Sequence, residues 1–163
     1  MNSQIEALRT LWSDSVVDVS VGDERIKGGG IDPLPGRQIP IWIGGRSAAA
    51  LKRAVTLGQG WLSNFQDHLA NDRADYLASI EELKAAADGT LPVGFGIESW
   101  TTPTRTSPDT WAAEVAEWAS LGVTHLSLRT DESRRDNYGA VKNVDEHRAV
   151  LAQYAQVVAN LGG

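Results

Sequence analysis

A short apolar run followed by two glycines and a serine is the part of the sequence best suited to bind an anion. The run Ile39-Pro40-Ile41-Trp42-Ile43 predicts a buried strand, because β-branched residues dominate it. Gly44 and Gly45 follow, and Ser47 is a good N-cap for the Ala-rich helix that comes next. A helix that begins directly after such a turn offers backbone N–H groups and the positive end of its dipole. The pattern predicts a phosphate site.

Arg46 lies inside this turn and has two interpretations. It is either a solvated residue at the start of the helix or a ligand of the bound anion. A positive charge at a helix N-terminus is unfavourable unless an anion compensates it. Gly44 and Gly45 also have two interpretations. They either form a simple turn or let the backbone approach a phosphate closely, and the surrounding strand and helix favour the second interpretation.

Strand and helix patterns alternate from residue 39 to the end of the chain. Strands are predicted over residues 39–44, 60–65, 93–100 and 124–130, each followed by an amphipathic helix. Residues 1–38 predict a helix with a capping box at Ser3 and Glu6, a small hairpin over residues 16–26 and an irregular linker. We therefore expect one domain, residues 1–163, in which residues 39–163 form four β/α units.

Four strand–helix units predict a parallel sheet, which is either doubly wound or part of a barrel. A complete (β/α)8 barrel takes ~250 residues, whereas this chain has 163. The length fits (β/α)4, the C-terminal half of a TIM barrel. Such a half has two unpaired edge strands, and closure by a second copy would pair them. We therefore expect an obligate homodimer with an apolar interface of on the order of 2,000 Å².

The composition narrows the function classes. Hydrophobic residues make up 42% and charged residues 22% of the chain, as in an ordinary soluble globular protein. The net charge of −6 argues against nucleic acid as a partner, since a phosphate backbone needs a basic face. The chain has no cysteine, no signal-peptide pattern and no apolar run near ~18 residues. We expect a cytoplasmic protein that does not bind membranes.

Four short motifs resemble successive signatures of the luciferase-like monooxygenases. They are Pro33-Leu34-Pro35, the strand with Gly44-Gly45, Leu57-Gly58-Gln59-Gly60-Trp61, and Leu121-Gly122-Val123-Thr124-His125-Leu126-Ser127. The branch that they resemble most is the group of oxidoreductases that use the deazaflavin coenzyme F-420. The resemblance covers nearly the whole chain, but only the C-terminal half of such proteins.

The resemblance implies a (β/α)8 barrel with FMN or coenzyme F-420 at the carboxyl ends of its strands. Gly44 and Gly45 match the glycines whose backbone holds the cofactor phosphate, and Arg46 and Ser47 follow them. Two further positions, in the second strand, match residues that face the cofactor ring or the substrate. They are Ser63 and Asn64. The first four strands, which carry much of the ring pocket in this family, have no counterpart here, so the catalytic residues are unassigned.

The last strand offers one more candidate. Alternation places Leu126 and Leu128 toward the helices and His125, Ser127 and Arg129 toward the barrel axis. Arg129 lies nearest the carboxyl end, where such barrels keep their sites, so it is a candidate ligand for a substrate or an anion. The three histidines have no partners at metal-ligand spacing, so no metal site is expected.

Two functions follow from these observations. The first is an oxidoreductase, either a monooxygenase or an F-420-dependent reductase or dehydrogenase, of which this chain is half of the active unit. In that case the cofactor supplies the chemistry and the protein positions it. The second is a non-catalytic half-barrel that binds a phosphorylated ligand or serves only in assembly. Retention of the two glycines favours binding, whereas the missing half disfavours turnover.

Overall fold

The computed structural model describes residues 1–66, 72–102, 107–130 and 143–159, and it confirms the predicted alternation of strands and helices. The strands are β1 (Val17–Val21), β2 (Glu24–Gly29), β3 (Trp42–Gly44), β4 (Gly60–Gln66), β5 (Gly96–Thr101) and β6 (His125–Leu128). The helices are α1 (Asn2–Ser13), α2 (Ala48–Leu57), α3 (Asp72–Ala86), α4 (Pro108–Ser120) and α5 (Val144–Ala159).

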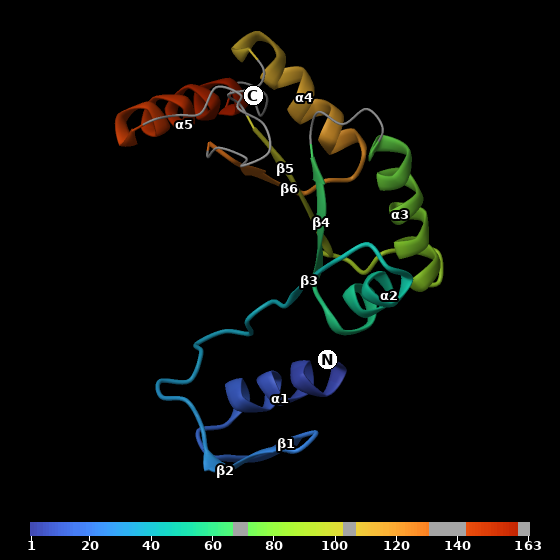
Figure 1. Ribbon diagram of the computed structural model, residues 1–163, viewed down its shortest axis with the longest axis vertical. Coiled ribbons are helices and arrows are strands. Elements are labelled where there is room, and N and C mark those ends of the chain that lie inside the picture. Colours follow the sequence, from blue (N-terminus) through green and yellow to red (C-terminus); the bar gives the residue numbers. More distant parts are fainter. Residues whose placement is uncertain (67–71, 103–106, 131–142, 160–163) are drawn as a thin grey trace.

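The strands β3 to β6 form a four-stranded parallel sheet in sequence order, while β1 and β2 pair as an antiparallel hairpin. Figure 1 shows α2, α3, α4 and α5 following one another around the same side of this sheet. Parallel strands in sequence order, connected by helices on one side, are the repeating unit of the (β/α)8 barrel. The architecture is therefore half of a TIM barrel, as the sequence predicts.

The core lies between the sheet and its helices. Alternate residues of the strands point toward the helices, as the burial of Ile43, Trp61 and Ile97 shows. Helices α2 and α3 contribute four large side chains to the same cluster: Leu51, Tyr76, Ile80 and Leu83. Each fully buried side chain of this size stabilises the fold by about 1.5–3 kcal/mol.

The opposite face of the sheet is open, and one tryptophan crosses its amino-terminal end. A Cβ at Gly60 would lie 2.5 Å from Cδ2 of Trp42, and a Cβ at Gly96 would lie 2.2 Å from its Cη2. The ring of Trp42 then meets the ring of His125 edge to face, with centroids 4.9 Å apart. Trp42 therefore spans from β3 to β6, and it does so because β4 and β5 both begin with glycine.

Two predicted strands are shorter at their amino ends than the sequence indicated. Phe95 N–H donates to the carbonyl of Pro92 at 3.0 Å and Gly94 has a φ of +76°, so residues 92–95 form a turn and β5 begins only at Gly96. The N–H of Ile41 donates to the side chain of Gln59 at 2.9 Å, so the ladder of β3 begins at Trp42. In both cases the apolar residues are present, but their backbone N–H donates to a turn carbonyl or to a side chain instead of to a neighbouring strand.

The helix starts agree with the predicted cap at Ser47 and differ from the predicted capping box at Ser3 and Glu6. Ser47 caps α2, and Ser107 and Pro108 begin α4. The predicted capping box at Ser3 and Glu6 was wrong, because the N-cap of α1 is Met1, two residues before Ser3, and no side chain caps the helix. Asn143 caps α5: its Oδ1 accepts the N–H of Glu146 at 3.0 Å.

We predict that Gly96→Ala destabilises the protein, because the new methyl group would collide with the ring of Trp42. The expected loss in the free energy of unfolding is about 1–3 kcal/mol, the usual cost of overpacking. Urea unfolding followed by tryptophan fluorescence measures it. Gly36→Ala is the matched control, since a Cβ at Gly36 has nothing within 4 Å. Equal stability of the two variants would contradict the wedged position of Trp42.

Candidate functional site

The turn between β3 and α2, residues 44–47, has the backbone geometry that the sequence predicted for it. Gly45 has a φ of +113°, a conformation that side chains with a Cβ rarely adopt. A Cβ there would also lie 3.2 Å from the Cβ of Ala50. Ser47 caps the helix, with its side-chain oxygen accepting the N–H of Ala50 at 3.3 Å. A glycine is therefore required at position 45.

The start of α2 offers hydrogen-bond donors to an external group. The N–H groups of Ala48 and Ala49 have no acceptor among the described residues, as expected for the first turn of a helix, and both residues are exposed. No acidic residue occupies this turn of α2. Arg46, which is exposed, precedes it. Free donors, the positive end of the dipole and a neighbouring guanidinium suit a phosphate or another anion.

A tryptophan of the next strand forms a hydrogen bond to the backbone of this turn. The indole Nε1–H of Trp61 donates to the carbonyl oxygen of Gly45 at 2.8 Å. Trp61 is fully buried and stacks on Tyr76 of α3, with ring centroids 6.1 Å apart and planes 23° apart. Sequence reasoning did not predict this bond to the turn. No local pattern reveals it, because Gly45 follows β3 whereas Trp61 lies in β4.

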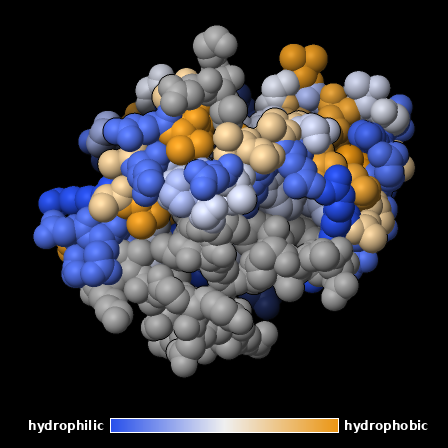
Figure 2. Space-filling model, turned by 90° about the horizontal axis from the view of Figure 1, so that it is seen from above, coloured by the Kyte–Doolittle hydropathy of each residue, from blue (hydrophilic) through white to orange (hydrophobic). Residues whose placement is uncertain are grey.

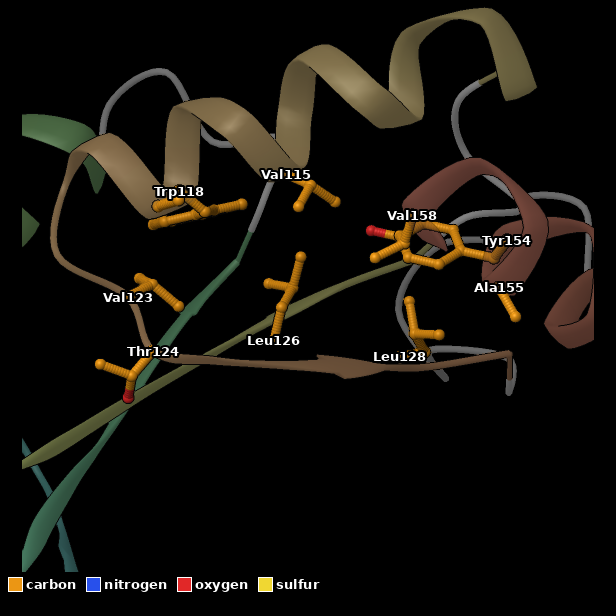
Figure 3. A pocket seen from close by; sticks show the side chains of 10 residues that line it. Val115, Trp118, Val123, Thr124, Leu126, Leu128, Tyr154, Ala155 and Val158 are labelled. Carbon is orange, nitrogen blue, oxygen red and sulfur yellow. The ribbon is translucent and has the colours of Figure 1, made fainter. Parts of the chain in front are cut away.

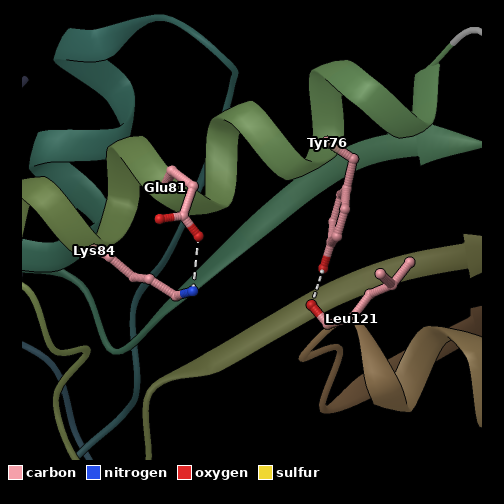
Figure 4. Close-up of polar contacts among 4 residues, drawn as sticks. All are labelled: Tyr76, Glu81, Lys84 and Leu121. Carbon is pink, nitrogen blue, oxygen red and sulfur yellow. Dashed lines mark hydrogen bonds and ion pairs between the residues drawn. The ribbon is translucent and has the colours of Figure 1, made fainter.

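Tyr76 connects that tryptophan to the fourth helix. Its hydroxyl donates to the carbonyl of Leu121 at 3.3 Å (Figure 4), and its ring meets Trp118 edge to face with centroids 5.4 Å apart. Burial raises the pKa of Tyr76 to about 12, since the phenolate would lose its hydration. The chain of contacts from Trp118 through Tyr76 to Trp61 ends at the glycine turn.

The open face carries a separate cluster near the carboxyl ends of β5 and β6. The guanidinium carbon of Arg129 lies 4.4 Å from the centre of the Trp100 ring. The N–H of Arg129 continues the ladder beyond β6 by donating to Thr101 at 2.8 Å. A guanidinium stacked on an aromatic face keeps the N–H groups at its edge directed sideways, which suits a carboxylate or phosphate. Arg129 is thus placed at the end of the sheet where the sequence predicted it.

Alternation in β6 agrees with the prediction as well. Leu126 and Leu128 face α4 and α5, whereas His125 meets Trp42 on the open face. Glu98 is paired with His125 in the ladder and shares the face opposite to the buried Ile97 and Ser99. The open face therefore combines two tryptophans with polar side chains.

The two residues predicted in β4 are Ser63 and Asn64. Ser63 is fully buried, and the pairing of β4 with β5 is irregular between Leu62 and Gln66. The predicted contact of Ser63 with the cofactor ring or the substrate stays a prediction. Asn64 lies in β4, but its side chain is outside the described part of the structure. Its contact with a cofactor stays a prediction.

A cavity that the sequence did not predict lies between α4, α5 and β6. Its volume is about 430 Å³, and Figure 3 shows the side chains that line it. Most of its lining is apolar: Val115, Trp118, Ala119, Val123, Thr124, Leu126, Leu128, Tyr154, Ala155 and Val158. It lies on the helix-covered side of the sheet, so it is distinct from the glycine turn and from Arg129.

Metal-binding and membrane-spanning features do not occur in the described residues. No group of three or more His, Asp or Glu side chains that could hold a metal ion is found among them. His147 contacts the hydroxyl of Thr130 at 2.6 Å, whereas His68 lies outside the described residues. Within the same part of the chain, no helix combines the length and apolar character that a membrane crossing needs.

Comparison with known proteins finds one matching family and a similar solved structure. The family model for luciferase-like monooxygenases matches residues 3–159. A solved structure with a similar fold is that of the monooxygenase RslO1 from Streptomyces bottropensis, with a TM-score of 0.72 and 13% sequence identity. The match covers 99% of this chain but 60% of that one, so the chain spans well under the full length of this relative. No curated protein matches the chain.

We predict that the buried phenol of Tyr76 makes stability fall at high pH. Its pKa is raised from the ordinary value of 10.0 to about 12. The unfolded chain therefore loses this proton before the folded protein does, so the contribution is complete below pH 10 and is lost as the pH rises through 12. Thermal unfolding between pH 8 and pH 12 tests this. In Tyr76→Phe the fall in melting temperature above pH 10 should be smaller than in the wild type. An equal fall would contradict the assignment.

Proposed function

Since the chain belongs to the luciferase-like monooxygenase family, we propose that it is half of an oxidoreductase barrel that binds a phosphorylated flavin-type cofactor at residues 44–47. The cofactor is FMN or coenzyme F-420, the two kinds that this family uses. The observation that carries the proposal is the glycine turn, where a left-handed Gly45 precedes the free N–H groups of Ala48 and Ala49.

The residues present fit a phosphate. The absence of a Cβ at Gly45 lets the backbone approach the ligand closely, and Ser47 keeps the first turn of α2 in place. Arg46 supplies a positive charge beside it. When bound, the cofactor supplies hydride transfer or oxygen activation. The residues of this chain then bind the phosphate, and Arg129 holds a carboxylate or phosphate of the substrate or of the cofactor tail.

We also propose a second candidate function, because the chain spans only 60% of the matched monooxygenase. Half of a barrel holds half of the residues that surround a cofactor ring. The alternative is therefore a non-catalytic half-barrel that binds a phosphorylated ligand or serves in assembly. Both functions use the same glycine turn, and turnover of a substrate would separate them.

We predict that Gly45→Val weakens the binding of FMN or F-420 through strain at the turn. Forcing a β-branched residue into this backbone conformation costs about 1–3 kcal/mol, which corresponds to roughly fivefold to 150-fold in the dissociation constant. Absorbance titrations of the purified protein measure it. Gly36→Val is the control, because position 36 has open space and no left-handed backbone. Unchanged affinity in Gly45→Val would refute the site, and no binding of either cofactor to the wild type would refute the function.

We further propose that two copies close one barrel. The outer edges of β3 and β6 have no partner strand among the described residues. A two-fold axis along the barrel axis keeps all strands parallel, so that β6 of one copy pairs with β3 of the other. Exposed apolar side chains such as Leu151 on α5 would then have a surface to pack against. In Figure 2 such hydrophobic side chains form separate patches among hydrophilic ones.

The dimer predicts a definite mass. Sedimentation equilibrium at low micromolar concentration should give twice the 17.6 kDa of one chain. The physical reason is that unpaired strand edges and an open aromatic face are stabilised by pairing. A stable, well-folded monomer at this concentration would refute the dimeric barrel.

A further inference from the structure

The hydrogen bond from Trp61 to Gly45 is unusual in its placement, because it fixes a single peptide group at the turn. The donor is a fully buried indole N–H and the acceptor is the Gly45 carbonyl, 2.8 Å away. Gly45 lies in the left-handed region with a φ of +113°. Glycine has the widest choice of backbone conformations, so this peptide needs an external contact to hold it in one orientation.

The orientation of that peptide decides where the next N–H points. In a trans peptide the C=O and the following N–H point in opposite directions. The carbonyl of Gly45 is directed at Trp61, beneath the helices, so the N–H of Arg46 is directed away from the indole. A flipped peptide would place a carbonyl oxygen on the side where an anion approaches, and the oxygen would repel it.

The indole itself is held by packing. It stacks on Tyr76 with centroids 6.1 Å apart, and Tyr76 is anchored by its bond to the carbonyl of Leu121 and by the ring of Trp118. A phenylalanine would fill most of the same space but has no N–H to donate. The substitution Trp61→Phe therefore removes the hydrogen bond and keeps most of the packing.

We infer that Trp61 is a positioning residue for the phosphate site, acting through its indole N–H on the Gly45–Arg46 peptide. The inference rests on the proposed function, because it assumes a phosphate at residues 44–47. The ligand class is a phosphomonoester or phosphodiester of a flavin-type cofactor. Trp61 is buried and touches no ligand itself; it sets the direction of the N–H group that does.

The test compares FMN with riboflavin, which differs from FMN only by lacking the phosphate. In the wild type, FMN should bind more tightly than riboflavin. In Trp61→Phe the affinity for FMN should fall roughly threefold to tenfold, the effect of one hydrogen bond, with riboflavin unchanged. A merely structural loosening would weaken both ligands together. Trp118→Phe is the matched control, since Trp118 packs on Tyr76 through its ring and should keep the preference for FMN.

The outcomes separate the two proposals. Equal binding of FMN and riboflavin by the wild type would overturn the phosphate site and, with it, the role of Trp61. A wild-type preference for FMN that survives in Trp61→Phe would overturn the role of Trp61 alone. Circular dichroism establishes whether each variant is folded.

A measurement on the wild type covers the case in which Trp61→Phe does not fold. The Trp61 indole proton, assigned by triple-resonance NMR, should exchange slowly with solvent and shift when FMN is added. The indole proton of Trp118 should not shift with FMN. Rapid exchange of the Trp61 proton, or no shift at saturating FMN, would overturn the inference.

Discussion

The contact series of three aromatic rings between the sheet and its helices is the interaction on which the rest of the structure depends. Trp61, Tyr76 and Trp118 come from β4, α3 and α4, and their rings contact one another in that order. Large aromatic rings bury more apolar surface than any other side chains, so this series contributes strongly to the attachment of the helices to the sheet. Trp61 of this series also donates a hydrogen bond to the carbonyl of Gly45 in the turn after β3. The same aromatic residues therefore pack the core and hold the turn of the candidate site in place.

The two faces of the sheet have different chemistry, and this difference follows from strand alternation. Ile43, Trp61 and Ile97 face the helices and are buried. The other face carries Trp42, which lies over two strand glycines, and the stacked pair of Trp100 and Arg129. In a closed barrel, residues on this face surround the axis, and ligands bind at the carboxyl ends of the strands. Arg129 and the glycine turn both lie at those ends.

Membership in the luciferase-like family and the half-barrel architecture support the same interpretation. The family model covers residues 3–159, almost the whole chain. The fold matches that of a monooxygenase whose chain is considerably longer. A cofactor between two halves of a barrel would contact both, so under the proposed function this chain would contribute one side of the site. The phosphate end of such a cofactor is the part that a single glycine turn can hold, which is why binding and turnover are separate questions for this protein.

The sequence by itself determined the local features. Apolar runs and helical periodicity predicted the four strand–helix units, and the glycines with Ser47 predicted the capped turn, because these signals act within a few residues. Contacts between strands were decided only by the tertiary structure. No local pattern shows that Trp42 requires glycines at positions 60 and 96, or that Trp61 binds the turn. The sequence thus determines which elements form, whereas packing in three dimensions determines which side chains meet.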